Sequence, residues 1–149
     1  MASLYFCQMK NFKHNTPIQL RFADMDMMGH ANNAAYATFI EYARMKYFDE
    51  VVREEGVWSK LEGLIIARLE IDFRKPIILG DSISVYTRCS RIGTKSFDME
   101  CVIVKTENKT EVIVAETKVV VVCFDYKTNS TIPISDERKK KVSDYEAQN

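Results

Sequence analysis

One stretch of the chain carries helical periodicity, and the residues after it carry the pattern of strands. Apolar side chains recur at three- and four-residue spacing between residues 36 and 51, which predicts one long helix with a single apolar stripe. The stripe consists of Tyr36, Phe39, Ile40, Ala43, Tyr47, Phe48 and Val51. Asn32 or Asn33 suits the N-cap position, and Gly56 suits the end of the segment. Because a lone helix must bury its stripe against a sheet, the pattern restricts the chain to an α+β fold.

Four runs after the predicted helix alternate apolar and polar residues, as half-buried antiparallel strands do. They cover residues 65–74, 82–89, 97–103 and 112–125. The last run is apolar on both faces from Val119 to Phe124, which predicts a central strand. A short strand is expected at residues 18–22 and a short solvated helix at residues 135–141. One helix covers only one face of such a sheet, so we expect an oligomer to bury more of the surface.

Composition and motifs exclude several classes of protein. The chain has 149 residues, the length of one domain, and its 21 basic and 21 acidic residues give a formal net charge of zero. A nucleic-acid-binding domain is normally basic, so that class is disfavoured. The five glycines form no G-x-G-x-x-G dinucleotide fingerprint, no phosphate-binding P-loop and no G-x-S-x-G hydrolase motif.

The cysteines and histidines point to a reduced protein without a metal. No two of the four cysteines form a C-x-x-C pair, and the first residues show no cationic segment followed by an apolar one. We therefore expect reduced, mostly buried cysteines and a cytoplasmic location. With only His14 and His30 available as imidazole ligands, no zinc site is expected.

Residues 21–36, with the sequence RFADMDMMGHANNAAY, resemble the opening motif of the hotdog-fold acyl-CoA thioesterases, in the 4-hydroxybenzoyl-CoA thioesterase-like branch. The similarity continues through residues 41–44, 68–81 and 95–97, and it covers roughly residues 15–135 of a single domain that spans 1–149. It implies a hotdog fold, in which a curled antiparallel β-sheet wraps one long central helix. It also implies a homodimer or homotetramer with active sites between subunits.

The resemblance implies hydrolysis of an acyl-CoA to a free acid and coenzyme A, with no cofactor other than the coenzyme A of the substrate. Asp26 matches the family's catalytic aspartate, which acts as general base or nucleophile. Asn33 matches the residue whose backbone amide stabilises the oxyanion, a role that suits a helix N-terminus. His30 is a third catalytic candidate, because plant acyl-carrier-protein thioesterases use Asp, Asn and His in a similar motif. Here Met28 replaces that Asn.

The residues expected to bind substrate are Gly29, Asn32, Tyr36, Glu41, Arg91, Lys95 and Ser96. Gly29 would let the thioester approach closely, and Arg91, Lys95 and Ser96 match the region where the family binds coenzyme A. Glu41 either pairs with Arg44 one turn later or orients water. Tyr36, Phe39 and the methionines at 25, 27 and 28 either line a flexible acyl pocket or belong to the core.

Two further expectations concern Asp24 and the acyl group. Asp24 lies two residues before Asp26, so it points the other way if the segment is extended, and we expect it to be structural. The stretch from His30 to Asn33 lacks the aromatic character of the hydroxybenzoyl enzymes, so we expect aliphatic substrates.

Three alternative functions remain open on the sequence. The first is hydrolysis of acyl groups from an acyl carrier protein, and the second is a hotdog hydratase. The hydratase branch spaces Asp and His by four residues, and the interval to His30 is one too short from Asp26 and one too long from Asp24. The third is an acyl-CoA-binding homologue without activity.

Overall fold

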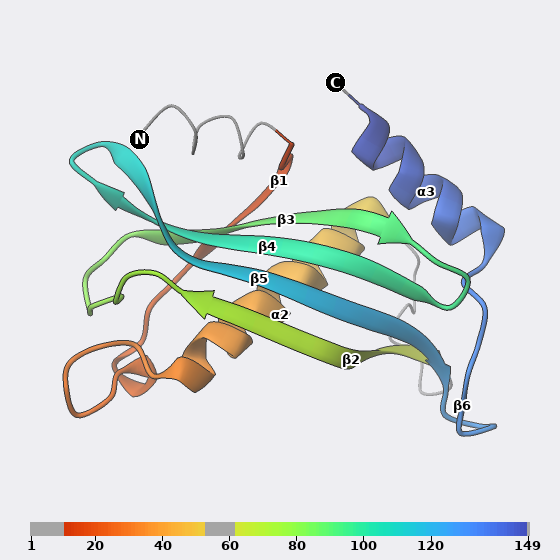
Figure 1. Cartoon of the computed structure of the whole chain (residues 1–149), viewed down its shortest axis with the longest axis horizontal. Coiled ribbons are helices and arrows are strands. Elements are labelled where there is room, and N and C mark those ends of the chain that lie inside the picture. Colours follow the sequence, from red (N-terminus) through yellow and green to blue (C-terminus); the bar gives the residue numbers. More distant parts are fainter. Residues whose placement is uncertain (1–10, 53–61, 149) are drawn as a thin grey trace.

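One antiparallel sheet packs against one long helix. The computed structural model describes residues 11–52 and 62–148. Its strands are β1 (His14–Ile18), β2 (Glu62–Phe73), β3 (Ile83–Ile92), β4 (Ser96–Glu107), β5 (Thr110–Asp125) and β6 (Ser130–Thr131). Its helices are the 3₁₀ turn η1 (Phe22–Asp24), α2 (Asn33–Val51) and α3 (Asp136–Ala147). The strand order is β1-β3-β4-β5-β2, with β6 on β5 and α2 across one face (Figure 1). The predicted α+β hotdog architecture is therefore confirmed.

Helix α2 forms where the periodicity places it. The Asn32 side chain accepts a hydrogen bond from the Ala34 amide at 2.9 Å, which caps the N-terminus. All seven residues of the predicted stripe are buried. The Tyr36 ring packs on Phe73 at the end of β2 with 5.0 Å between ring centroids, so the start of α2 lies over the end of β2. Helix α2 ends at Val51, and Gly56 lies outside the described residues.

The first strand is four residues earlier than expected. The strand predicted at 18–22 is wrong, because β1 spans His14–Ile18 and Phe22 begins η1. Polar residues hid it, since His14 and Thr16 are the ones that face the interior. Pro17 is tolerated because β1 lies at the sheet edge and pairs only with β3.

Strand β5 is central, as its apolar sequence predicts. It pairs with β4 on one side and with β2 on the other. Val119, Val121 and Cys123 point into the core, and the residues between them are half-buried. Cys89 and Cys101 are buried free cysteines, Cys123 is buried as well, and Cys7 lies outside the described residues.

The C-terminal helix is longer than predicted and is docked. A solvated helix at 135–141 was expected, but α3 extends to Ala147 and buries Val142. The Glu146 carboxylate accepts hydrogen bonds from the Tyr47 hydroxyl at 2.5 Å and from the Cys89 amide at 2.7 Å. The run of three lysines dominates the sequence pattern and conceals these contacts. No helix in the described part of the chain is long and apolar enough to span a membrane.

Charged side chains cover the sheet face opposite α2. In register across four strands lie Arg88, Glu100, Lys118 and Glu70, with alternating sign. The Arg88 guanidinium binds the Glu100 carboxylate at 2.6 Å. This face needs no apolar cover. The exposed apolar residues lie elsewhere, and on β2 and α2 they include Ile66, Phe73, Tyr42 and Met45.

Candidate functional site

A tight turn fixes Asp26 just before α2. One carboxylate oxygen, Oδ1, accepts hydrogen bonds from the Met28 amide at 2.8 Å and the His30 amide at 3.1 Å. The Asp26 amide donates to the His30 carbonyl at 2.7 Å, and the Gly29 amide donates to the Asp26 carbonyl at 3.1 Å. Gly29 has a φ of 79°, a conformation that suits glycine. The carboxylate is thus oriented by backbone amides while its side chain stays exposed.

The turn is anchored on both sides by backbone pairing. The Ala31 amide donates to the Ile77 carbonyl at 2.8 Å, and His30 forms an isolated bridge with Ile78. The Asn32 amide donates to the Asp24 carbonyl at 2.8 Å. These contacts tie the turn to the segment that follows β2, so the position of Asp26 is set by the sheet.

The two carboxylates of the motif have different environments. Asp24 is only 4% exposed and binds the Arg21 guanidinium at 2.7 Å and the Arg21 amide at 2.8 Å. The hydrogen bond from Arg21 lowers the pKa of Asp24 below its usual range. Asp26 is exposed and has no ion pair to a described residue. This contrast fits the prediction that Asp24 is structural.

The N-terminus of α2 presents backbone donors beside Asp26. Asn33 is the first residue of α2, a position whose N–H has no acceptor within a helix. The Asn32 side chain accepts a hydrogen bond from the Ala34 amide, and the Asn32 carbonyl accepts one from the Ala35 amide at 2.8 Å. The structure therefore brings Asp26, Gly29, His30, Asn32 and Asn33 into one exposed loop at the positive end of the helix dipole.

Two other candidates lie further along α2, one buried and one exposed. Tyr36 is buried, its hydroxyl donates to the Lys75 carbonyl at 3.4 Å, and burial raises the pKa of its hydroxyl. Glu41 is exposed, and eight residues of helix separate it from Asn33 by about 12 Å. No ion pair joins Glu41 to Arg44 among the described residues.

The remaining candidates lie at the opposite end of the sheet. Arg91 and Lys95 flank the connection from β3 to β4, and Ser96 begins β4. The Lys95 ammonium binds the Thr131 carbonyl at 3.0 Å. A strand of the length of β4 spans about 40 Å, and the Asp26 turn lies toward the end of the sheet where β2 and β4 finish, opposite to the start of β4 (Figure 1). The candidate residues of one chain therefore form two separate groups, which we call half-sites.

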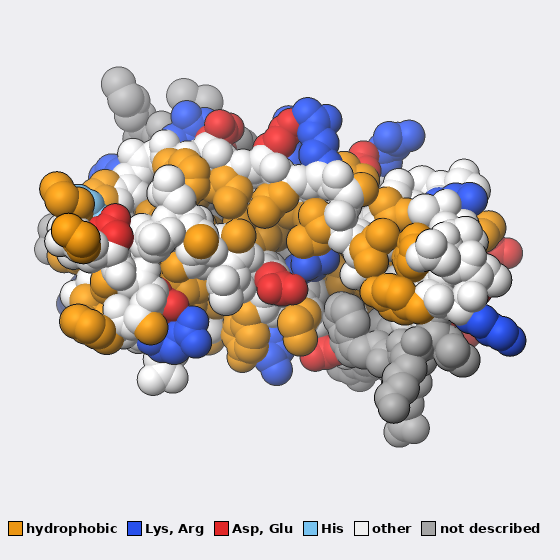
Figure 2. Space-filling model, turned by 90° about the horizontal axis from the view of Figure 1, so that it is seen from below, with side chains coloured by type: hydrophobic (Ala, Val, Ile, Leu, Met, Phe, Trp, Pro, Cys, Tyr) orange, Lys and Arg blue, Asp and Glu red, His pale blue; other side chains and the backbone are white. Residues whose placement is uncertain are grey.

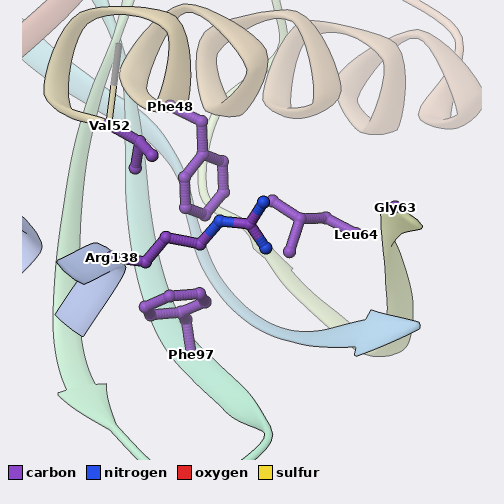
Figure 3. A pocket seen from close by; sticks show the side chains of 6 residues that line it. All are labelled: Phe48, Val52, Gly63, Leu64, Phe97 and Arg138. Atoms are coloured by element: carbon purple, nitrogen blue, oxygen red, sulfur yellow. The ribbon is translucent and has the colours of Figure 1, made fainter. Parts of the chain in front are cut away.

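A small cavity lies near the second half-site, at the end of α2. Its volume is about 10 Å³, and its lining consists of Phe48, Val52, Gly63, Leu64, Phe97 and Arg138. Figure 3 shows the Arg138 guanidinium among the side chains of Phe48, Leu64 and Phe97. The sequence pattern missed this residue because Arg138 lies in the basic helix that was expected to be solvated. Among residues 11–52 and 62–148, no cluster of His, Cys, Asp and Glu could hold a metal ion.

Comparisons with known proteins identify relatives of this chain in sequence and in structure. Residues 20–142 match the family model described as the thioesterase-like superfamily. The long-chain acyl-CoA thioesterase FadM of Escherichia coli is 25% identical over 127 residues, which are 85% of this chain and 95% of that protein. The chloroplastic acyl-acyl carrier protein thioesterase ATL3 of Arabidopsis thaliana is 26% identical over 76% of this chain and 60% of that protein. A Thermus thermophilus thioesterase, solved with coenzyme A and zinc, has a TM-score of 0.79 and 26% identity over 95% of this chain and 99% of that one.

Proposed function

Because the chain belongs to the thioesterase-like superfamily, whose members hydrolyse thioesters, we propose that it is an acyl-CoA thioesterase. It would release a free acid and coenzyme A. The single observation that carries the proposal is the exposed Asp26 carboxylate, oriented by two backbone amides directly before the N-terminus of α2. The relatives named for acyl-CoA hydrolysis or solved with coenzyme A support this choice of substrate.

The chemistry needs a base and an oxyanion donor. Asp26 takes a proton from water as the water oxygen attacks the thioester carbonyl carbon. The Asn33 amide and the dipole of α2 stabilise the oxyanion that forms. When the oxyanion collapses, the C–S bond breaks and the thiolate of coenzyme A leaves and is protonated. In the alternative route, Asp26 attacks the carbonyl directly and the C–S bond breaks, so that the thiolate of coenzyme A leaves and an anhydride remains. Water then hydrolyses this anhydride to the free acid and the Asp26 carboxylate.

We propose that a homodimer joins the two half-sites. Among the described strands, β2 lies at an edge of the sheet and pairs with β5 alone, and its exposed face includes Phe73, which is 47% exposed. Figure 2 views this side of the molecule and shows hydrophobic side chains spread across it. Antiparallel pairing of two β2 edges places the Phe73 end of one strand beside the Glu62 end of the other. The Asp26 turn of one subunit thereby approaches Lys95 and Ser96 of the second subunit. The ammonium group of Lys95 suits the phosphates of coenzyme A.

A panel of acyl-CoA substrates tests the proposal. Release of coenzyme A is followed with a thiol-trapping reagent, and the free acid is identified by mass spectrometry. We expect stoichiometric acid and thiol from at least one acyl-CoA. Binding of acyl-CoA without release of thiol would instead support a non-catalytic homologue.

The similarity to a plant acyl-acyl carrier protein thioesterase favours one second candidate. The same acyl group attached to acyl carrier protein is therefore offered in parallel with the acyl-CoA. A higher kcat/KM for the carrier-protein substrate would assign the chain to that activity. A higher value for acyl-CoA would support the main proposal.

A further inference from the structure

A buried cation in the middle of α2 lacks an ion-pair partner among the residues that the structure describes. Arg44 is only 4% exposed, and its Nε atom is buried without a hydrogen bond. No described carboxylate lies within ion-pair distance of its guanidinium. Burial lowers the pKa of the Arg44 side chain, which shows that desolvation outweighs the attraction of nearby groups. Since an unpaired buried charge is costly, the guanidinium needs a partner from outside the described chain.

One turn earlier on the same helix lies an acidic residue, Glu41, that can pair with Arg44 of a second copy of the chain. Glu41 interacts electrostatically with Arg44, but it is exposed and does not pair with it. Helix α2 spans Asn33–Val51, so Tyr42 is its middle residue. The point halfway between Glu41 and Arg44 lies within one residue of Tyr42. A two-fold axis that passes this point, perpendicular to the helix, makes the second helix antiparallel to the first. Glu41 of each helix then lies opposite Arg44 of the other.

The same axis passes the middle of β2. At one end Tyr36 packs on Phe73, and at the other end Phe48 and Leu64 line the same cavity. The middle of α2 therefore lies beside the middle of β2, where the register shifts between Ile66 and Arg68. An axis that pairs two β2 edges at their centres thus also brings the centres of two α2 helices toward each other.

The surface around these charges is apolar. Met45 on α2 is exposed, as is Ile66 on β2. Figure 2 shows hydrophobic side chains spread over this side of the molecule. A second copy that covers this surface excludes water from the charges, which strengthens an ion pair between them.

We propose that Glu41 and Arg44 form two reciprocal ion pairs across the two-fold axis of a homodimer. This inference rests on the dimer of the proposed function and assigns the residues that set its register. A register shift would leave both guanidinium groups buried without a partner. The contact therefore selects the alignment in which the Asp26 turn of one subunit meets the coenzyme A half-site of the other.

A charge-exchange experiment tests the contact between subunits. In Glu41→Lys homodimers, two cations face each other at both contacts, and in Arg44→Glu homodimers two carboxylates do. A heterodimer of the two variants restores opposite charges at both contacts. We expect each variant alone to sediment as a monomer at micromolar concentration with at least tenfold lower hydrolysis. We expect an equimolar mixture to sediment as a dimer and to recover most of that activity.

Controls separate the contact from folding and from net charge. Asp136→Lys makes the same change of charge on exposed α3 and should remain a dimer. Circular dichroism reports whether each variant is folded. If Arg44→Glu does not fold alone, the test uses the dissociation constants of the dimers formed by Glu41→Gln, Arg44→Met and the double variant. We expect each single change to raise the constant at least tenfold, and the double change to add little more.

Three results would overturn the inference. The first is that the folded charge variants remain dimers when each is alone, and the second is that their mixture remains monomeric. The third is that the dissociation constant of the neutral double variant rises by the product of the two single effects. Sedimentation needs no substrate, so absence of hydrolysis by the wild-type protein would refute the proposed function and leave this test intact. A wild-type monomer would refute the shared site itself.

Discussion

Replacement of Asp26 by Asn isolates the chemical role of the carboxylate. Oδ1 of Asp26 accepts two backbone N–H groups, and the carbonyl oxygen of an Asn side chain can accept both in the same place. The turn should therefore keep its shape while the base is lost. Loss of a general base lowers the rate by about 10²–10⁴-fold. That corresponds to a barrier higher by about 3–5 kcal/mol.

The assay compares kcat/KM of the wild type and Asp26→Asn on the best acyl-CoA of the panel. Thermal unfolding of both proteins is measured at the same concentration, because a large loss of stability would point to a structural role. We expect a fall of at least a hundredfold in kcat/KM with little change in melting temperature. Turnover within tenfold of the wild type would refute the assignment of Asp26 as the catalytic base.

Asp24→Asn is the matched control, since it makes the same chemical change two residues away. Asp24 is buried against Arg21, so this variant should lose stability rather than catalytic power. A larger loss of kcat in Asp24→Asn than in Asp26→Asn would show that the other carboxylate is catalytic.

Three further predictions concern stability and substrate. The folded-state pKa of Asp24 is lowered, so its contribution to stability is present above its unfolded pKa and disappears as the pH falls through the folded value. Urea unfolding at pH 5 and pH 3 should therefore show a loss of stability that is smaller in Asp24→Asn. Glu146→Leu removes the acceptor of the Tyr47 hydroxyl and the Cys89 amide, which should cost about 1–3 kcal/mol for each buried group, whereas Glu146→Gln should cost less. Denaturant midpoints of the two variants measure this, and equal midpoints would contradict it. For straight-chain acyl-CoAs, kcat/KM should rise by at most about fourfold per methylene until the pocket is full, and it should exceed the value for 4-hydroxybenzoyl-CoA. A flat profile would show that the methionines near Asp26 do not contact the acyl chain.

Short-range patterns explain what the sequence predicts well. The stripe of α2 and its Asn32 cap depend on residues within a few turns of one another, and both occur as predicted. Strand β5 is recognisable because a strand covered on both faces is apolar throughout, as the run from Val119 is. The Asp26 turn depends on Gly29 and on hydrogen bonds within four residues. Each of these features is local, so one sequence contains the information for it.

The separation of the candidate residues between two ends of the sheet does not follow from residues that are close in sequence. Asp26 and Lys95 are both recognisable by resemblance, but only the strand order shows that one chain holds them far apart. In the proposed homodimer a symmetric second copy resolves this separation, and no spacing within a single sequence encodes the position of a symmetry axis.

The errors of the sequence analysis share a physical cause, because polar residues were assigned to the surface. His14 and Thr16 face the interior and hid β1, and Arg138 reaches into the cavity at the end of α2. Arg44 was paired with Glu41 on the helix surface as one alternative, whereas the structure buries it. Burial of such a group requires a partner, and His14 has Glu50 at 3.3 Å while Arg44 has none among the described residues. Nδ1 of His14 and the hydroxyls of Thr16 and Thr87 are also buried without a hydrogen bond, but Arg44 is the permanently charged member of this group. Among the described residues, Arg44 is therefore the side chain that most needs a partner from a second copy in the proposed dimer.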